Sequence, residues 1–570
     1  MKISIGINTY KQEKDFTDRQ KFCVESLRKV KAIYPDIVEL YNITFEDEDI
    51  KLEGFTSLPK LKIKVKEVLD DYFRVYIKEC DETRQNLINN YNKRLPSVYE
   101  IFEVLSEQNS DYFLFLNDDI ILSDRFIKNI LDNLGYDSYP ASRIHLLNFK
   151  GLDDKEITME SYSVHGFDAF AINTKWWKKQ HYNFPNYILG KPYWDTHYFT
   201  LCQLFGNAFV LNKLPPVMFH PEHASTSCTT TDIALQYNED IFNRALIIKQ
   251  LWFTYVHKVL LMRKPSNGCK WMIPFNNEPE LEKGYFKQAI TLGFTSPTDN
   301  KQMPLKITSN HKVDVILPCA PKDYIKLPYA LESVQKHIKE LGNIHICTPN
   351  RIGVVSNDSN VFYHLDMEVL PNVKPELWKF RPNWIYQQMI KLFQNITDTE
   401  YYLTYDVDGI LNRTLPMFNG EHPIWYKGWR QNEISYSMFN HYFLGLEKTK
   451  PHTFIGDLCF FNKIIIKDML SRYNLTPETF VQKSYDLVKY PCHIGEPELY
   501  GSYFSKYYPD LYEVRDIKQY HYGKVQNDVM VVNWTKGEIE ALVAQYKDQD
   551  YDIIQMHSWC GDSKNYWEKT

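Results

Sequence analysis

The sequence predicts an α/β protein made of two tandem domains, each built on a parallel sheet, joined by a helical connector. Three observations predict it. At 570 residues the chain is too long for one hydrophobic core. Each half follows the order strand, helix, strand, helix, strand, which is typical of a parallel sheet. In each half the third apolar strand runs directly into a cluster of acids.

The first half supplies its elements in that order. Apolar runs predict the strands, and residues recurring every three to four positions predict the helices. A proline interrupts the second helical stretch, so helix is expected on either side of it. The predicted elements are a strand at 2–9, a helix near Arg19–Val30, a strand near Ile37–Ile43, helix within 84–108 and a strand at 112–119.

The second half repeats the order with little residue identity, so the architecture is repeated rather than a short motif. Its predicted elements are strand Val313–Pro318, helix Tyr329–Glu340, strand Asn343–Thr348, helix Asn383–Asn395 and strand 401–408.

We expect four segments along the chain. Asp232–Met262 has helical periodicity, whereas 264–311 is rich in Pro, Gly and Asn and predicts an irregular connection. The boundary between the halves is expected near residue 305. The segments are domain 1 at 1–230, a helical and irregular connector at 231–310, domain 2 at 311–525 and a C-terminal helical tail at 526–570, with its helix at Thr535–Lys547.

Composition narrows the class of protein. Hydrophobic residues make up 44% and charged residues 24%, as in ordinary globular proteins. A formal net charge of −6 argues against a generally basic surface for nucleic acid. The ten cysteines form no C-x-x-C pair or zinc pattern, and no signal peptide or membrane span is evident. We expect a cytoplasmic protein.

The two acid clusters carry the chemistry. YFLFL precedes Asn117-Asp118-Asp119, and YYLTY precedes Asp406-Val407-Asp408. Ligands of open α/β sheets bind at the carboxyl ends of the strands. Because alternate strand residues share a face, Asp406 and Asp408 can converge on one Mg²⁺ or Mn²⁺, as can Asn117 and Asp119. Such a cation neutralises charge on a departing diphosphate.

Further polar residues follow each cluster in the same order. An acid in the middle of each series suits a general base on an acceptor hydroxyl, and a late histidine suits a metal ligand. In the first half these residues are Asp168, Asp195, His220 and His223; in the second half they are Asp457, Glu496, Glu498 and His521.

With these residues, each half resembles a GT-A glycosyltransferase, a fold with a D-x-D motif, a downstream catalytic acid and often a late metal-binding histidine. Residues 381–392 also resemble the W-x-x-Q-Q-x-x-K-L element of one group of these transferases. The resemblance implies a bifunctional hexosyl- or pentosyltransferase. It also implies a nucleotide-diphosphate sugar as donor, a divalent cation (Mn²⁺ or Mg²⁺), and a glycan as acceptor, free or linked to lipid or protein.

The resemblance also implies roles for individual residues. The expected base is Asp195 in the first site, and Glu496 or Glu498 in the second. Thr9 and Tyr10, and Pro318 and Ala320, are expected to border the nucleobase. The expected donor contacts are Asn117, Asp118, Asp168, Asp406, Asp457, Gln388 and Lys391, and the expected metal ligands are Asp119, His220, His223, Asp406, Asp408 and His521.

Alternatives remain open at this point. Asn117 occupies the first D-x-D position, so the first domain is the candidate for a catalytically dead, glycan-binding module. YLTYDVDGIL also resembles the start of haloacid-dehalogenase-type phosphatases, in which Asp406 would be a phosphorylated nucleophile and Asp408 an acid and base. The sequence does not separate an inverting from a retaining transfer.

Overall fold

The computed structural model divides the chain into two compact units, Met1–Thr291 and Leu292–Thr570. Each is described by itself. The structure describes residues 1–69, 82–91, 93–141, 144–146, 167–211, 217–221, 232–245, 248–249, 252, 312–353, 355–378, 381–427, 434–487, 494–522, 525–526, 529–530, 534–547 and 549–556.

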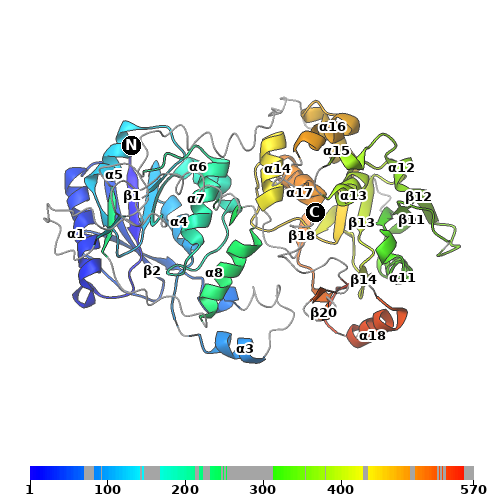
Figure 1. Cartoon of the computed structure of the whole chain (residues 1–570), viewed down its shortest axis with the longest axis horizontal. Coiled ribbons are helices and arrows are strands. Elements are labelled where there is room, and N and C mark those ends of the chain that lie inside the picture. The colour runs from blue at the N-terminus through cyan, green and yellow to red at the C-terminus, as the bar shows by residue number, and fades with distance from the viewer. Residues whose placement is uncertain are drawn as a thin grey trace, which may run out of the picture. The chain divides into compact units, whose positions relative to one another are not determined.

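The first unit is a mixed sheet between two layers of helices (Figure 1). Its strands are β1 (Ile3–Ile7), β2 (Val38–Phe45), β3 (Thr56–Leu61), β4 (Tyr112–Leu116), β5 (Ile121–Leu122), β6 (Ser138–Ala141), β7 (Ile144–Leu146), β8 (Ala169–Asn173) and β9 (Met218–Pro221). Its helices are α1 (Asp18–Ile33), α3 (Glu82–Asn89), α4 (Val98–Ser106), α5 (Asp124–Asp132), α6 (Thr174–Gln180), α7 (Trp194–Phe205) and α8 (Ile233–Arg244).

The main sheet of this unit has the order β3-β2-β1-β4-β8-β6. Neighbouring strands from β3 to β4 are parallel, and β8 is antiparallel to both β4 and β6. Helices α1 and α5 lie on one side of the strands, and α4, α6 and α7 on the other (Figure 1). The strands β1 and β4 are fully buried, as expected for a parallel sheet covered on both faces.

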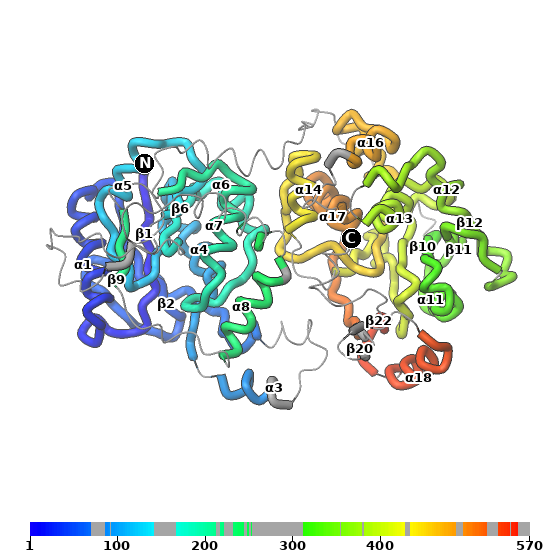
Figure 2. Tube along the Cα trace, in the orientation of Figure 1, coloured from blue at the N-terminus to red at the C-terminus, as the bar shows by residue number. Residues whose placement is uncertain are grey.

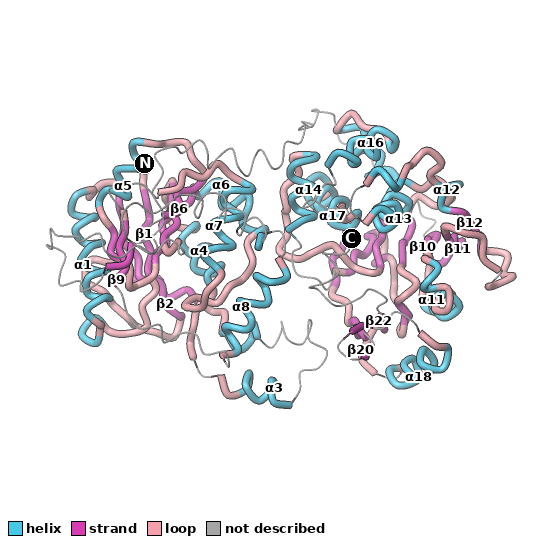
Figure 3. Tube along the Cα trace, in the orientation of Figure 1, coloured by secondary structure: helices cyan, strands magenta, loops and turns pink. Residues whose placement is uncertain are grey.

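The second unit repeats this plan, with strands surrounded by helices (Figure 3). Its strands are β10 (Val313–Pro318), β11 (Leu341–Thr348), β12 (Val361–Leu365), β13 (Tyr401–Tyr405), β14 (Gly409–Leu411), β15 (Phe418–Asn419), β16 (His422–Tyr426), β17 (Leu458–Asn462), β18 (Glu513–Arg515), β19 (Gln519–Tyr522), β20 (Val525–Gln526), β21 (Val529–Met530) and β22 (Ile553–Met556). Its helices are α11 (Leu327–His337), α12 (Asp366–Val369), α13 (Pro382–Phe393), α14 (Ile434–Leu444), α15 (Lys463–Arg472), α16 (Pro477–Leu487), α17 (Glu496–Tyr507) and α18 (Lys536–Tyr546).

Its main sheet has the order β12-β11-β10-β13-β17, parallel from β12 to β13 and antiparallel at β17. This matches the order β3-β2-β1-β4-β8 of the first unit strand for strand. The fold class expected from the sequence, an α/β chain with two parallel-sheet units, is therefore confirmed. None of the helices in the described ranges combines the length and apolarity that a membrane span needs.

Both units carry a second, smaller sheet next to the acid cluster. In the first unit its order is β5-β9-β7, and in the second it is β14-β22-β19. The strands that follow the acids, β5 and β14, are antiparallel to the central strands β9 and β22. These central strands are parallel to β7 and β19. This repeated small sheet brings late residues of each unit back to the acid cluster.

The segment 526–570, expected as a helical tail, contains more than a helix. Its strand β22 lies between β14 and β19, and Ile554 and Met556 are fully buried with Trp534 and α18 in one apolar cluster. The red α18 lies near the green α11 (Figure 2), and the Tyr329 hydroxyl of α11 donates to Glu540 Oε1 of α18 at 3.2 Å. The C-terminal segment is thus part of the second unit.

We expect Ile554→Ala to lower the free energy of unfolding of the second unit by about 3 kcal/mol, because it leaves a cavity in this cluster. The measurement is hydrogen exchange of peptides that cover β13 and β14. Met367→Ala, at a side chain that is 65% exposed, is the matched control and should change little. Unchanged exchange in Ile554→Ala would mean that β22 is an independent tail.

Candidate active sites

The first acid cluster lies where β4 gives way to β5. Leu116 of β4 pairs with Ala169 of β8, so the antiparallel register places Asn117 opposite Asp168. The Asn117 amide donates to Asp168 Oδ1 at 3.1 Å. Asp168 is buried at the start of β8. Backbone pairing therefore brings together two residues that are far apart in the sequence.

Asp119 of the same cluster meets His220. The two strands β5 and β9 pair with Ile121 opposite Phe219, and His220 Nε2 lies 3.2 Å from Asp119 Oδ2. His220 is buried. A carboxylate oxygen and an imidazole nitrogen therefore face each other at the carboxyl edge of the sheet. His223, the other expected histidine, lies outside the described residues.

Asp118 points to a different neighbour. Its Oδ2 accepts from Gln20 Nε2 of α1 at 2.6 Å. Burial raises the pKa of this carboxyl to about 6, and the adjacent Asp119 carboxylate adds to the rise. Asp118 thus anchors the cluster to α1.

Asp195 lies in the first turn of α7, and its carboxylate accepts from the Phe167 backbone N–H at 3.1 Å. Since Phe167 directly precedes Asp168, this bond ties Asp195 to the segment that faces Asn117. Tyr193, the residue directly before α7, has a φ of 84°. Its ring stacks on that of Phe242 of α8, with 5.0 Å between the ring centres. The entry into α7 is thus held in a fixed geometry.

The residues expected beside the nucleobase border the same edge in each unit. The Thr9 hydroxyl is fully buried and donates to Asn42 Oδ1 at 3.0 Å, whereas Tyr10 is 61% exposed. In the second unit Pro318 is the last residue of β10, and Ala320 follows it at the start of a short turn of helix. Only Tyr10 offers a large exposed side chain.

In the second unit a buried lysine connects two carboxylates. Lys391 Nζ of α13 lies 2.6 Å from Asp406 Oδ1 and 3.5 Å from Glu496 Oε1, at the start of α17. Lys391 and Glu496 are almost fully buried, whereas the Asp406 side chain is one-third exposed. Burial lowers the pKa of Lys391, but the two carboxylates outweigh it and the net shift is upward.

Glu496 and Glu498 have separate surroundings. The Gln388 amide faces the Glu496 carboxylate; when the amide is turned so that its nitrogen points toward this carboxylate, it donates to Oε1 at 3.0 Å. Burial raises the pKa of Glu496 to about 7, opposed by Lys391. Glu498 instead accepts from Lys448 Nζ at 2.5 Å, Thr453 Oγ1 at 3.0 Å and the Phe454 N–H at 2.8 Å. Of the two, Glu496 is the one joined to the Asp406 cluster.

Asp457 stands opposite Asp406 just as Asp168 stands opposite Asn117. Tyr405 of β13 pairs with Leu458 of β17, and the Asp406 N–H donates to the Asp457 carbonyl at 3.2 Å. The two units therefore match residue by residue at these positions.

Asp408 is held by the C-terminal strand. Gln555 Nε2 donates to Asp408 Oδ1 at 2.6 Å, and the Met556 N–H donates to the Asp408 carbonyl at 2.6 Å. Lys326 Nζ donates to the Met556 carbonyl at 2.7 Å. Burial raises the pKa of Asp408 to about 8, with Asp406 as the next cause.

The register of the small sheets identifies Gln555 as the counterpart of His220. Extending the antiparallel pairs Ile121–Phe219 and Gly409–Gln555 places Pro221 opposite Asp119 and Met556 opposite Asp408. His220 and Gln555 therefore hold the same position, and each contacts the second residue of its acid pair. His521, the expected ligand, lies on the next strand, opposite Gln555, as His145 lies opposite His220. The His521 side chain is outside the described residues.

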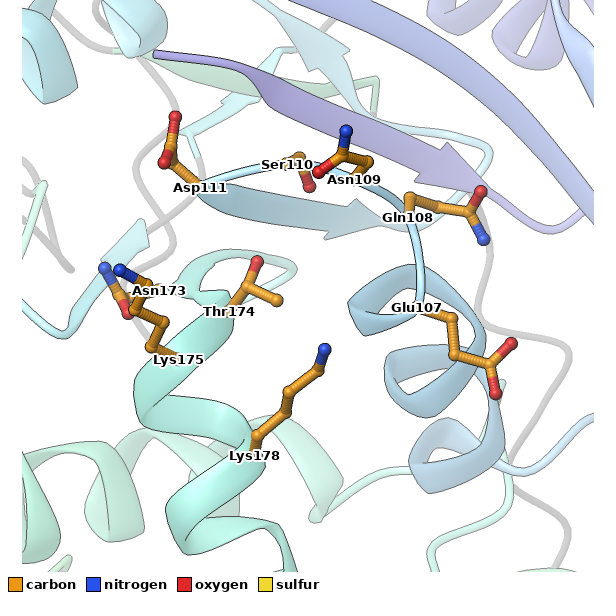
Figure 4. Close-up of a pocket in the computed structure, with 9 residues that line it drawn as sticks. All are labelled: Glu107, Gln108, Asn109, Ser110, Asp111, Asn173, Thr174, Lys175 and Lys178. Atoms are coloured by element: carbon orange, nitrogen blue, oxygen red, sulfur yellow. The ribbon is translucent and has the colours of Figure 1, made fainter.

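A hollow of about 340 Å³ elsewhere in the first unit is separate from these sites (Figure 4). It is lined by residues from the end of α4 to Asp111, which precedes β4, and by the start of α6. Because strands rise about 3.3 Å per residue, the five residues of β4 separate Asp111 from Asn117 by more than 15 Å. The hollow therefore lies at the amino edge of the sheet, opposite the acid cluster.

Comparison with known proteins gives structural likeness alone. No protein-family model matches the chain, and no curated protein matches it in sequence. Among solved structures, S. aureus TarS 1–349 in complex with UDP-GlcNAc is 12% identical, with a TM-score of 0.25 over 50% of this chain and 71% of that one.

Two further solved structures are similar. Mouse xyloside xylosyltransferase 1 is 12% identical, with a TM-score of 0.24, over 43% of this chain and 97% of its own. The galactosyltransferase LgtC, in complex with donor and acceptor sugar analogs, is 11% identical, with a TM-score of 0.25, over 45% and 94%. Because these TM-scores lie below 0.5, we take the fold and the function from this chain's own pairings and contacts.

We expect Lys391→Met to destabilise the second unit by about 3 kcal/mol, because it leaves the Glu496 carboxylate buried without its cation. Adding Glu496→Gln should recover most of the loss, since Asp406 is partly exposed to solvent. The measurement is a double-mutant cycle in urea. Additive losses would contradict a direct coupling between Lys391 and Glu496.

The stability of the first unit should fall in acid because of His197 on α7. Burial lowers the pKa of His197 to about 3. Its ring nitrogen Nδ1 is hydrogen-bonded to the Tyr187 hydroxyl at 2.7 Å. The unfolded chain binds the proton near pH 6.5 and the folded one does not, so stability present above pH 6.5 is lost as the pH falls toward 3. His197→Gln should flatten this slope in urea unfolding at pH 4 to 7; an unchanged slope would exclude His197 as its source.

Proposed function

We propose that the chain is a glycosyltransferase with one active site in each unit, moving sugars from nucleotide-diphosphate donors to a glycan acceptor. The observation that carries the proposal is the contact of the buried Lys391 with the buried Glu496 and the partly exposed Asp406, at the carboxyl edge of a parallel sheet. That edge is where open α/β sheets bind nucleotides. The match of Asn117, Asp119 and Asp168 with Asp406, Asp408 and Asp457 supports a related site in the first unit.

A divalent cation fits the donor atoms of both sites. No group of three or more His, Cys, Asp or Glu gathers within the described ranges. In the first site Asp119 and His220 offer an oxygen and a nitrogen. In the second site, Asp408 lies beside the buried Gln555 Oε1, which has no hydrogen-bond partner among the described residues. Carboxylate and amide oxygens suit Mg²⁺ or Mn²⁺.

When bound, a cation in each site would neutralise the donor diphosphate. Asp119 and His220 would hold it in the first site, and Asp406 and Asp408 in the second. His223 and His521 remain candidates whose side chains are outside the described residues. Asp406 is the least available of the four, because Lys391 already lies against it. Lys391 and Gln388 would contact the donor sugar, together with Asp457, as Asp168 would in the first site.

Glu496 suits the role of base in the second site. Its pKa of about 7 lies near neutral pH, and a general base is most effective when its pKa is close to the working pH. The acceptor oxygen bonds to the anomeric carbon while the bond from that carbon to the diphosphate oxygen breaks, and the acceptor proton passes to Glu496. The nucleotide diphosphate leaves. Asp195, in the first turn of α7, is the corresponding residue of the first site.

The phosphatase alternative receives less support from the fold. In that family the D-x-D strand opens its domain, whereas here β10, β11 and β12 precede β13. The second alternative, a catalytically dead first domain, is separated by the experiment below.

We expect Asp119→Asn and Asp408→Asn each to lower nucleotide release at one site by about a hundredfold or more, because each removes a carboxylate that would hold the cation on the donor diphosphate. A panel of nucleotide sugars with Mn²⁺ or Mg²⁺ measures the release. Electron paramagnetic resonance should count about two Mn²⁺ per chain in the natural protein and about one in each variant.

Exposed acids provide matched controls for this pair. Asp49→Asn and Asp516→Asn change side chains that are 82% and 88% exposed and should leave release and Mn²⁺ binding intact. Release lost in Asp408→Asn alone would make the first unit a binding module. Unchanged release in both variants would refute the assignment of the sites.

A further inference from the structure

Arg381 has a strained backbone next to the second site. Its φ of 45 and ψ of 51 lie in the left-handed region, which L side chains rarely adopt. It directly precedes Pro382, which further disfavours helical conformations at this position. Outside glycine, the described residues with positive φ are Tyr193, Arg381 and Asn474. Such strain persists where the surroundings impose it, and it concentrates at ligand sites.

The strained residue places its guanidinium on an aromatic ring. The guanidinium carbon of Arg381 lies 4.4 Å from the centre of the Trp384 ring. This cation–π contact fixes the planar fork of N–H donors at the start of α13. Trp384 is only half-buried, in contrast to Trp378 and Trp425 of the same unit. The pair therefore reaches the surface.

The pair lies at the outer end of the row that forms the second site. Trp384, Gln388 and Lys391 are spaced by four and three residues, so they share one face of α13. Lys391 reaches Asp406, and Gln388 faces Glu496. The row runs from the half-buried indole to the fully buried ammonium.

Tyr436 of α14 also connects Trp384 to Glu496 by packing. The Trp384 ring lies 6.3 Å from that of Tyr436 on α14. A Cβ at Gly495 would come within 2.9 Å of Tyr436 Cδ1, so the tyrosine ring packs directly on the residue before Glu496. Trp384 and Arg381 are thus connected by packing to the carboxylate assigned as the base.

We propose that Arg381 and Trp384 form the acceptor subsite of the second site and bind the pyranose ring of the acceptor; this rests on the function proposed above. A pyranose has apolar C–H faces that pack on an indole and hydroxyls that accept from a guanidinium. With the donor at the Asp406 edge, a ring bound at this rim presents a hydroxyl toward Glu496. The backbone strain at Arg381 is then explained by the need to hold its guanidinium on the Trp384 ring.

The test uses the full chain with Arg381→Ala and Trp384→Ala, and methyl hexopyranosides as acceptors. We expect the acceptor KM to rise about tenfold in each variant, more than the donor KM, because a stacking and hydrogen-bonding surface is lost. Saturation-transfer NMR with the same glycosides, in the presence of UDP and Mn²⁺, should show weaker ring contacts. An equal rise in donor KM, or an unchanged acceptor KM, would overturn the proposal.

Arg381→Gly separates a binding role from a structural one. Glycine adopts positive φ freely, so this variant should unfold at a temperature no lower than the natural protein while its acceptor KM rises. The matched control is Asn474→Gly, at a positive-φ residue that follows α15, which should leave the acceptor KM unchanged. Lower stability with unchanged glycoside binding would make Arg381 structural and refute the subsite.

Failure of the proposed function would look different. If the natural protein releases nucleotide from no donor, transferase activity fails. Loss of NMR contacts in Arg381→Ala would then still support a sugar-binding pair, and retained contacts would refute it.

Discussion

Both sites depend on the register of antiparallel strands that pair beside the two acid clusters. β8 and β17 fix Asp168 and Asp457 opposite the first residue of each acid pair. β9 and β22 bring His220 and Gln555 to the second residue. Because these positions follow from backbone register, a slip of one residue would turn each side chain to the opposite face. The sites are thus as rigid as the sheets that carry them.

Much of this framework follows from local pattern. The strand β10 has the bounds expected from its apolar run, and α1, α13 and α18 begin and end within a few residues of their expected positions. Fully apolar strands and capped helices are recognisable because burial on both faces, or on one stripe, leaves a periodic signature. The acid clusters were also recognisable, since each follows such a strand.

Contacts that depend on register were not recognisable. The strand β22 has four residues, too few to distinguish from a buried turn, so its sequence IIQM gave no reason to place Gln555 beside Asp408. A histidine is the more familiar metal ligand, which favoured His521 one strand away. Glu496 and Glu498 share a helix but lie about 200° apart around it, so only packing decides which carboxylate faces Lys391.

The first D-x-D position differs in charge between the two units. In the second, the Lys391 ammonium offsets the additional carboxylate of Asp406. In the first, Asn117 is neutral, and α4, the helix that precedes β4, has no basic residue. An aspartate at 117 would add a negative charge that no basic residue of α4 offsets, whereas Asn117 keeps its hydrogen bond to Asp168.

Under the proposed function, a neutral Asn117 is compatible with a cation held at Asp119 and His220. At the two D-x-D positions alone, the first unit carries the Asp119 carboxylate, and the second carries Asp406 and Asp408 with Lys391 against Asp406. The neutral Asn117 amide and the charged Asp406–Lys391 pair offer different contacts to the sugar itself. Under the proposed function, these different contacts suit two transfers that share diphosphate chemistry and differ in the sugar.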